Sequence, residues 1–269
     1  MLDFIKMQGA GNDYIYVDCF EFALENPSEM AKILSKRRYQ IGSDGLVLMC
    51  NSKDYDAKMR IFNCDGSEAS MCGNAIRCMA KYLYESGRVG KSHLKIETLS
   101  GIRDVFLTIK NGKIGLICVD MGKAIIGEMF FFESRGEKYE MRSVNVGNHH
   151  QVVFLKDINS LSLEQIGRGF EQNPRFEGGV NTEFCEILDK NHLKVRVFER
   201  GSGETLACGT GACASVVVAA SLGLCDFEQS IRVTMRGGDL LVKCERDYHL
   251  FLTGDAHEVF RGKIDISLN

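Results

Sequence analysis

An internal repeat limits the possible folds of this chain more than any other feature of its sequence. The segment KMRIFNCDGSEASMCGNAIRC, which starts at Lys58, aligns with KVRVFERGSGETLACGTGACA, which starts at Lys194, at an offset of 136 residues. Seven of the thirty positions from Lys58 to Gly87 are identical without a gap, whereas ordinary composition would give roughly two by chance. A duplication of this length predicts two structural copies of one half.

The same offset holds upstream of the best-matched segment. It places Gly11-Asn12 on Gly147-Asn148. It also aligns Asn26–Glu29 with Ser162–Gln165, two segments that resemble capping boxes and so predict a helix start in each copy. We therefore expect a first half at 1–120, completed by a C-terminal strand at 263–269, and a second half at 121–262. The boundary should lie near Asp120 to Gly127.

Each half is rich in strand patterns and carries one helix after a cysteine. The alternating runs YDAKMRIFN and HLKVRVFE indicate antiparallel strands, and Asn111-Gly112 suits a type I′ hairpin turn. Apolar residues recur at helical spacing from Ala75 to Leu83, with Gly87 ending the pattern, and 212–222 is an apolar run apart from Ser215 and Ser221. We expect an α+β fold with two pseudo-symmetric, β-rich, barrel-like halves. Each half should wrap around a central helix, with the active site in the cleft between them.

Composition narrows the classes of partner. The formal net charge is -3, so the chain lacks the basic excess that a nucleic acid backbone calls for. No secretory leader pattern and no stretch of 18 apolar residues is present, so we expect a cytoplasmic protein without a membrane partner. The eleven cysteines form no CxxC pair, which gives poor support to a metal site or a disulfide framework.

Two cysteines occupy matched positions that suggest a reaction. Cys72 and Cys208 each precede a small-residue turn and a helix start. A helix N-terminus presents unpaired N–H groups and a positive dipole end, which should lower the pKa of a thiol and can hold a carboxylate. If a pseudo-twofold axis relates the halves, the two thiols can face opposite sides of one carbon. Inversion of a stereocentre needs that arrangement, because one group removes a proton while the other delivers one.

The plainer interpretation is that both cysteines are inherited core positions. Their flanks weaken it, because 65–68 and 201–204 are polar and form turns, unlike the surroundings of a core sulfur. Cys78 and Cys213 lie inside the predicted helices, and we assign them to packing.

These motifs together resemble the diaminopimelate epimerase family across nearly the whole chain. The resemblance rests on GAGNDY, FNCDGSEASMCGN, VGNHH, VNTEF and FERGSGETLACGTGACA, in this order and spacing. It implies two pseudo-symmetric halves, no pyridoxal phosphate or other cofactor, and no metal. It also implies conversion of LL-diaminopimelate to the meso form, a step toward lysine and peptidoglycan.

The resemblance also assigns roles to residues. It makes Cys72 and Cys208 the catalytic pair. It assigns the backbones of four residues to the reacting carboxylate, namely Gly73, Asn74, Gly209 and Thr210. Asn12 and Glu199 would lie near the reacting ammonium. The distal amino-acid end would bind Asn63, Asn148, Asn181 and Arg200, which fits its chemistry because a carboxylate suits an arginine fork and an ammonium suits amide oxygens.

Three positions depart from the family pattern. His150 matches the family's histidine, which implies a supporting role in the site. His149 replaces a rigid proline, so the loop is expected to be more mobile. Gly45 stands where some members carry a side-chain amide, and Cys64 stands where a smaller or non-thiol residue is usual.

Two other functions remain open at this point. Proline and hydroxyproline racemases resemble this pattern and use paired thiols, but a one-ended imino acid has no use for Arg200 and four asparagines. A thiol redox or metal-binding module would instead use the many cysteines. The sequence leaves the assembly open, with a homodimer as one candidate.

Overall fold

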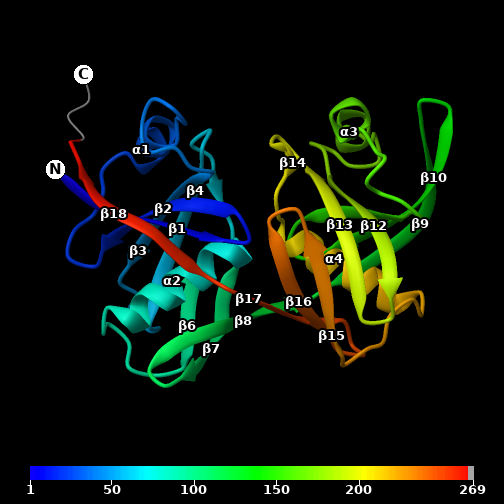
Figure 1. Cartoon of the computed structure of the whole chain (residues 1–269). Coiled ribbons are helices and arrows are strands. Elements are labelled where there is room, and N and C mark those ends of the chain that lie inside the picture. The colour runs from blue at the N-terminus through cyan, green and yellow to red at the C-terminus, as the bar shows by residue number, and fades with distance from the viewer. Residues whose placement is uncertain (266–269) are drawn as a thin grey trace. The chain divides into compact units, whose positions relative to one another are not determined.

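The computed structural model describes residues 1–265, which divide into two compact units. Unit 1 comprises Met1–Val119 together with the returning chain that starts at Gly254, and unit 2 comprises Asp120–Thr253. Figure 1 shows the strands and helices of each unit. Among the described residues, no helix combines the length and the apolar character needed to cross a bilayer.

Unit 1 is a mixed sheet with two helices. Its strands are β1 (Leu2–Gly9), β2 (Asn12–Cys19), β3 (Gly45–Cys50), β4 (Ala57–Asn63), β5 (Glu68–Ala69), β6 (His93–Thr98), β7 (Gly101–Lys110), β8 (Lys113–Lys123) and β18 (His257–Ile264). Its helices are α1 (Pro27–Leu34) and α2 (Gly73–Glu85). The paired strands follow the order β18-β1-β2-β3-β4-β6-β7-β8, parallel at β2/β3 and at β4/β6.

Unit 2 repeats this plan. Its strands are β9 (Ile125–Ser134), β10 (Glu137–Asn145), β11 (His149–Phe154), β12 (Asn181–Asp189), β13 (His192–Glu199), β14 (Gly203–Thr205), β15 (Ser230–Met235), β16 (Gly238–Cys244) and β17 (His249–Gly254). Its helices are α3 (Leu163–Glu171) and α4 (Gly209–Ser221). The order is β9-β10-β11-β12-β13-β15-β16-β17, parallel at β11/β12 and at β13/β15.

The two strand orders confirm the predicted pseudo-symmetry. The offset of 136 residues that relates Cys72 to Cys208 also carries α2 onto α4 at both ends. The register agrees as well, because Tyr14 lies opposite Gly45 and the equivalent His150 lies opposite Asn181. Within residues 1–265, no pairing joins the last strand of either series back to its first. The halves are therefore curved open sheets and not closed barrels.

Strand β18 is the edge strand of unit 1, next to β1, and β9 has the equivalent place next to β10 in unit 2. Strand β18 pairs antiparallel with β1, with Leu2 opposite Ile264. The sequence placed the returning strand at 263–269, whereas the strand begins at His257. Positions 266–269 lie outside the described residues.

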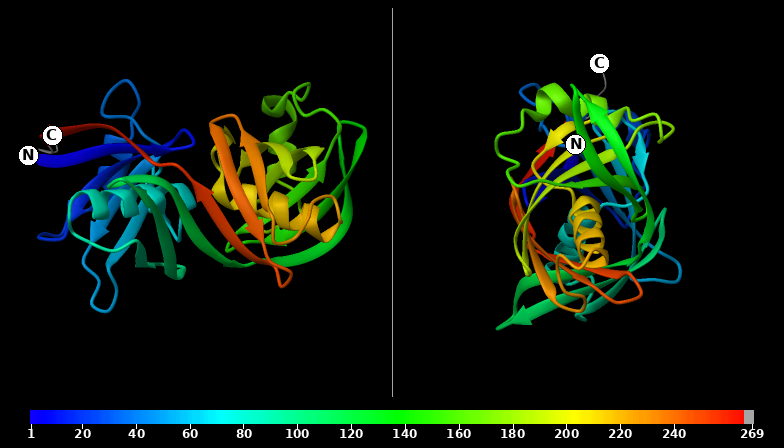
Figure 2. Two further views of the ribbon diagram at one scale, coloured as in Figure 1. Left: turned by 60° about the horizontal axis from the view of Figure 1, so that its bottom comes forward. Right: turned by 90° about the vertical axis from the view of Figure 1, so that its right-hand side faces the viewer.

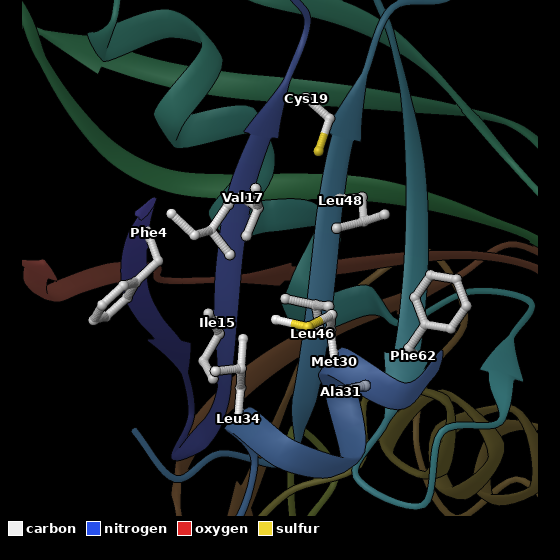
Figure 3. Packing of buried hydrophobic residues seen from close by; sticks show 11 residues of the cluster. Phe4, Ile15, Val17, Cys19, Met30, Ala31, Leu34, Leu46, Leu48 and Phe62 are labelled. Carbon is white, nitrogen blue, oxygen red and sulfur yellow. The ribbon is translucent and has the colours of Figure 1, made fainter. Parts of the chain in front are cut away.

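The sheet of unit 1 is covered by helices on both faces. Along β2, Ile15 and Val17 pack into a cluster with Met30 and Leu34 of α1 (Figure 3). Tyr16 points to the opposite face, where its hydroxyl donates to the Ala75 carbonyl of α2 at 3.2 Å. This alternation follows from the period of two along a strand.

The central helices confirm the prediction that each half wraps around one helix. Helix α2 buries its apolar stripe, and in α4 the residues from Gly211 to Ala220 are all buried. In the right-hand view of Figure 2, α4 (yellow to orange) lies inside the curve of its own sheet. The predicted packing roles of Cys78 and Cys213 are confirmed, since both have no exposed surface.

Local turn signals were only partly correct. The type I′ turn is confirmed, because Asn111 and Gly112 both have positive φ between β7 and β8. The capping boxes are wrong, although both helices begin where expected. Neither Asn26 nor Ser162 makes a side-chain cap bond, and Asn26 adopts the left-handed conformation. Only their carbonyl groups accept hydrogen bonds from the first turn.

Candidate active site

Cys72 lies at the N-cap of α2 in unit 1. Its backbone is extended, with φ of -143°, so the helix begins at the next residue, and the Cys72 side chain makes no cap hydrogen bond to the first turn. The thiol donates to Asn12 Oδ1 at 3.4 Å. Asn12 is the first residue of β2, directly after the turn that joins β1 to β2. This turn therefore meets the start of α2 at the Cys72 sulfur.

Asn74 on α2 also forms a hydrogen bond to Asn12. Its side-chain nitrogen donates to the same Asn12 oxygen at 3.3 Å, and its own oxygen accepts from Arg77 at 2.9 Å. Asn74 is buried, as is the preceding Gly73. The sequence assigned only the backbone of Asn74, so the side-chain contacts are additional.

Asp44 holds the other side of Asn12. It accepts from the Asn12 side chain at 2.8 Å and forms an ion pair with Arg37 at 2.9 Å. Burial raises the pKa of Asp44, and the nearby Asp13 carboxylate raises it further. Sequence reasoning missed this residue, and its only signal was its place in the GSDGLV loop directly before a strand.

Asn63 lies one strand away from this group. Its side chain donates to Ser67 at 3.0 Å in the turn after β4, and it is opposite Gly45 in the β3/β4 pairing. The structure brings together Asn12, Cys72 and Asn74 by hydrogen bonds. Within residues 1–265, Asn63 forms no hydrogen bond to these three residues, and its side chain instead orders the turn after β4.

Gly45 leaves no room for the amide that some family members carry. A Cβ at this position would lie 2.1 Å from the Phe62 carbonyl oxygen and 2.9 Å from the Tyr14 ring. The backbone of β4 and the Tyr14 ring fill the space that a side chain at position 45 would need. Cys64, in the following turn, is exposed.

Cys208 occupies the equivalent N-cap of α4 in unit 2. Its sulfur accepts from the Gly211 N–H at 3.4 Å and lies 3.4 Å from the Thr210 hydroxyl. Gly209 is buried behind it. One N–H group of the first turn, that of Gly211, therefore donates to the sulfur, in line with the helix N-terminus that the sequence predicted.

The predicted fall in pKa is wrong for Cys208. Burial raises the pKa of this thiol well above its ordinary value, and the carboxylates of Glu199 and Glu183 raise it further. These effects outweigh the hydrogen bonds from Thr210 and Gly211, which act in the opposite direction. A raised pKa favours the thiol form of Cys208, and a thiol can deliver a proton.

Glu199, which the resemblance places near the reacting ammonium, lies beside Cys208. It accepts from the Thr205 hydroxyl and from the Cys208 thiol. Burial raises its pKa, and these two hydrogen bonds lower it. A partly buried carboxylate in this position can accept hydrogen bonds from an ammonium.

Glu183 is a fully buried carboxylate that the sequence analysis did not identify. Its Oε1 lies 2.7 Å from His150 Nδ1, and its Oε2 has no hydrogen-bond partner among residues 1–265. A Cβ at Gly211 would lie only 2.7 Å from that Oε1. Glycine at this position thus allows the first turn of α4 to approach the carboxylate.

His150 connects Glu183 to the predicted distal binding residues. Its Nε2 lies 2.9 Å from Asn148 Oδ1, so the ring bridges a carboxylate and an amide. His150 is fully buried, whereas His149 is exposed with its ring 6.2 Å from that of Phe176. The supporting role predicted for His150 therefore has a physical basis in orienting Asn148.

Asn181 and Arg200 are also joined. Asn181 Oδ1 accepts from the backbone N–H of Arg200 at 2.9 Å, which fixes the turn after β13. The Arg200 side chain is exposed and runs close to the backbone of Gly179. The asparagine thus positions the arginine, while the guanidinium stays available to a ligand.

No metal-binding group is present in the part of the chain that the structure describes. No three His, Cys, Asp or Glu side chains there converge as ligands.

Comparisons with known proteins give a consistent result. A model of the diaminopimelate epimerase family matches residues 4–126 and 142–259. The chain is 46% identical to a diaminopimelate epimerase of Acetivibrio thermocellus, with 98% of this chain and 99% of that protein covered. It is 44% identical to one of Methanococcus maripaludis, with 98% and 100% covered.

Solved structures with the same fold are more distant in sequence. A Bacillus anthracis phenazine biosynthesis protein of the PhzF family has a TM-score of 0.78 at 19% identity, covering 98% of this chain and 99% of that one. A probable proline racemase from Agrobacterium radiobacter has a TM-score of 0.75 at 13% identity, with 99% and 94% covered. At such identities the likeness concerns the fold alone.

Proposed function

Because the chain belongs to the diaminopimelate epimerase family, and is therefore an isomerase, we propose that it inverts one α-carbon of diaminopimelate with two cysteines. Cys72 and Cys208 serve as the acid/base pair. The observation that carries this assignment is their equivalent placement, each at the N-cap of a buried helix of 13 residues. The substrate is a small molecule, and the product of LL-diaminopimelate is the meso form.

The reaction needs no change of oxidation state. A thiolate on one face takes the α-proton, and the electron pair moves toward the α-carboxylate. The thiol on the opposite face then gives its proton to the same carbon, so the stereocentre is inverted and the two sulfurs exchange protonation states. The reverse reaction exchanges their roles, as microscopic reversibility requires.

The helix N-termini supply the stabilisation that proton removal requires. Negative charge develops on the α-carboxylate as the proton leaves, and N–H groups of a first helical turn are suitable donors for it. We assign this role to Gly73 and Asn74 in unit 1 and to Gly209 and Thr210 in unit 2. These are the first two residues after each cysteine, at the start of the helix.

The remaining predicted residues recognise the substrate. Asn12 and Glu199 accept hydrogen bonds from the reacting ammonium, because each already accepts one from a catalytic cysteine. A second set binds the distal amino-acid end and comprises Asn63, Asn148, Asn181 and Arg200. The exposed Arg200 guanidinium offers a bidentate fork to the distal carboxylate.

Replacement of each cysteine tests the assignment. Cys72→Ala and Cys208→Ala should each lower kcat for diaminopimelate epimerisation by about 10²–10⁴-fold, because neither thiol can replace the other. Cys225→Ala, which changes a buried cysteine outside the site, should remain active. A single site variant that keeps more than about a tenth of wild-type kcat would contradict the two-base mechanism.

A substrate comparison tests the alternative chemistry. Proton exchange at the α-carbon in deuterium oxide should occur with diaminopimelate and not with proline, since the proposed site binds two amino-acid ends. Exchange with proline alone would assign the chain to racemisation of an imino acid.

We further propose a homodimer that forms along β9. This strand is an edge of unit 2 and exposes Ile125, Met129 and Phe131, and an exposed apolar edge strand is a template for pairing with another chain. Phe131→Asp should shift the sedimentation coefficient from that of a dimer to that of a monomer. A wild-type monomer would refute the assembly.

We also propose that the protein is cytoplasmic. None of the cysteines within residues 1–265 is part of a disulfide, and a reducing compartment suits a chain with eleven cysteines.

A further inference from the structure

Cys19 and Cys50 are two cysteines that the proposed reaction does not use. Each is the last residue of its strand, β2 and β3 respectively, and the parallel register places the two residues directly opposite each other. Both belong to the cluster that packs against α1, where Cys19 is buried and Cys50 is half-buried. Figure 3 shows Cys19 on the same face of the sheet as Ile15 and Val17.

The two thiols form the last pair in a row of facing side chains. Ile15 lies opposite Leu46, and Val17 lies opposite Leu48, in the same register. Neighbouring strands are about 4.8 Å apart, which lies within the range of about 4.4–6.8 Å for Cα atoms that a disulfide joins. The side chains also meet, because the two thiols are hydrogen-bonded to each other. A bond between the sulfurs therefore needs little movement of the strands.

Two cations lie near Cys50. Lys58 is opposite Cys50 in the β3/β4 pairing, and Arg60 is two residues further along β4 on the same face. The hydrogen bond with Cys19 lowers the pKa of Cys50, and the charges of Arg60 and Lys58 lower it further, against the effect of burial. The same hydrogen bond raises the pKa of Cys19. Cys50 is therefore the more reactive thiol of the pair and also the more exposed one.

The pair lies at the opposite end of β2 and β3 from the candidate active site. Asn12 is the first residue of β2, and Asp44 directly precedes β3. At about 3.3 Å per residue, the seven steps from Asn12 to Cys19 span about 20 Å. The segment between the two cysteines carries α1 and ends shortly after Asp44. A bond between its ends would restrain this segment while leaving the site residues in place.

The second half of the chain has no such pair. The offset of 136 residues places Leu155 and Glu186 at the positions of Cys19 and Cys50. The shared fold therefore does not require a cysteine at either position.

We propose that Cys19 and Cys50 are a peroxide-sensitive modification site, at which the two thiols are oxidised to a disulfide that joins the ends of β2 and β3. The Cys50 thiolate attacks one oxygen of hydrogen peroxide, the O–O bond breaks, and the departing hydroxide leaves as water with the proton that Cys50 had released. Cys50 is then a sulfenic acid. The Cys19 sulfur attacks the Cys50 sulfur, so the S–S bond forms, the S–O bond breaks, and the hydroxyl group leaves as water with the Cys19 proton. The sulfurs lose two electrons and the peroxide gains them, and a thiol reductant reverses the change.

Peptide mapping of peroxide-treated enzyme is the first test. Reduced wild-type protein is treated with hydrogen peroxide, the remaining thiols are alkylated, and the protein is digested without reductant. A peptide that links Cys19 to Cys50 is expected, and dithiothreitol should abolish it. Cys64 is the internal control, because it is exposed but lies in no strand pair, and it should form no bond to another cysteine of the chain. Recovery of Cys19 and Cys50 only as separate, unlinked residues would overturn the proposal.

Thermal unfolding measures the effect of the bond. A cross-link that closes the segment between residues 19 and 50 restricts the unfolded chain, so oxidation should raise Tm of wild type by about 5–10 °C more than it raises Tm of Cys50→Ser. Cys118→Ser is the matched control and should behave like wild type, because it changes a half-buried strand cysteine that lies opposite Phe106. Equal shifts in wild type and Cys50→Ser would contradict a bond that restrains this segment.

The outcomes separate this site from the proposed reaction. Cys50→Ser should keep the epimerase activity of wild type and lose it in peroxide at the wild-type rate, because the pair lies apart from Cys72 and Cys208. Protection of the activity in Cys50→Ser would contradict this separation. If Cys50→Ser does not fold, Cys19→Ala replaces it, and mapping of the wild-type protein still decides whether the bond forms.

Discussion

Gly45→Ala should destabilise unit 1 although it adds a single methyl group. The added Cβ would lie 2.1 Å from the Phe62 carbonyl oxygen, 2.9 Å from Tyr14 Cε1 and 3.1 Å from Asn63 Cα. Two of these atoms are backbone, so relief requires movement of β4 and not rotation of a side chain.

The size of the effect follows from these contacts. Overpacking of a core by one or two methyl groups typically costs about 1–3 kcal/mol. The upper end, about 3 kcal/mol, applies here because the main obstacle is a carbonyl group of the neighbouring strand. A loss of this size lowers Tm by about 6–12 °C in a protein of this length class.

Thermal and urea unfolding measure this effect against a matched control. Gly90→Ala is suitable because a Cβ at Gly90 meets nothing within 4 Å, and it should be neutral or stabilise by up to about 1 kcal/mol. If Gly45→Ala lies within about 0.5 kcal/mol of wild type, the close packing of β3 on β4 is not as described. The epimerase activity that remains should also fall, because Asn63 moves with β4.

Three further predictions concern the site. Arg200→Lys should reduce kcat/KM for diaminopimelate severely, because an ammonium does not reproduce the bidentate fork on a carboxylate, and unchanged kcat/KM would remove Arg200 from the binding site. Glu199→Gln removes a carboxylate that raises the pKa of Cys208, so that pKa should fall and alkylation of Cys208 near pH 8 should rise about tenfold; a Cys208 rate that stays the same or falls would contradict this sign. Air oxidation of substrate-free enzyme should form a reversible Cys72–Cys208 disulfide, since thiols that flank one carbon come within bonding reach. Peptide mapping identifies the partner of each of these thiols, and another partner, such as Cys64 for Cys72, would contradict the facing arrangement.

The sequence predicted the architecture because a duplication can be compared with itself. The offset of 136 residues that relates Cys72 to Cys208 also relates α2 to α4 and the strand order of one unit to that of the other. Helix periodicity after Cys72 was strong, since the apolar residues of α2 form one buried stripe, and the segment after Cys208 was a long apolar run that is buried in α4. These signals are local or repeated, and neither requires knowledge of tertiary contacts.

The charged residues behind the cysteines could not be predicted in the same way. Arg77 binds the carbonyl of Asp255, which is 178 residues away in the chain. Asp44 contacts Asn12 across 32 residues. Glu183 is the third residue of β12, where strand alternation alone does not distinguish a functional carboxylate from a solvated one. Such pairs depend on how elements pack, for which a single sequence carries no direct signal.

The error about Cys208 has the same origin. A helix N-terminus does favour a thiolate, and the structure confirms that Cys208 lies at one. Its burial and its two acidic neighbours raise the pKa instead. Both follow from tertiary packing, so the local motif predicted the position of the thiol correctly and its protonation wrongly.

The central claim is that two thiols act on opposite faces of one carbon, and isotope transfer in deuterium oxide tests it most directly. LL-diaminopimelate is incubated with the enzyme in deuterium oxide until less than about a tenth of it is converted. Substrate and product are then separated, and the deuterium content of each is measured by mass spectrometry. The account predicts that the meso product carries one deuterium at the inverted carbon, because the donating thiol has exchanged with solvent, while the remaining substrate carries none. Product that keeps its original proton, or substrate that gains deuterium as fast as product forms, would show that a single group serves both faces and would contradict the account.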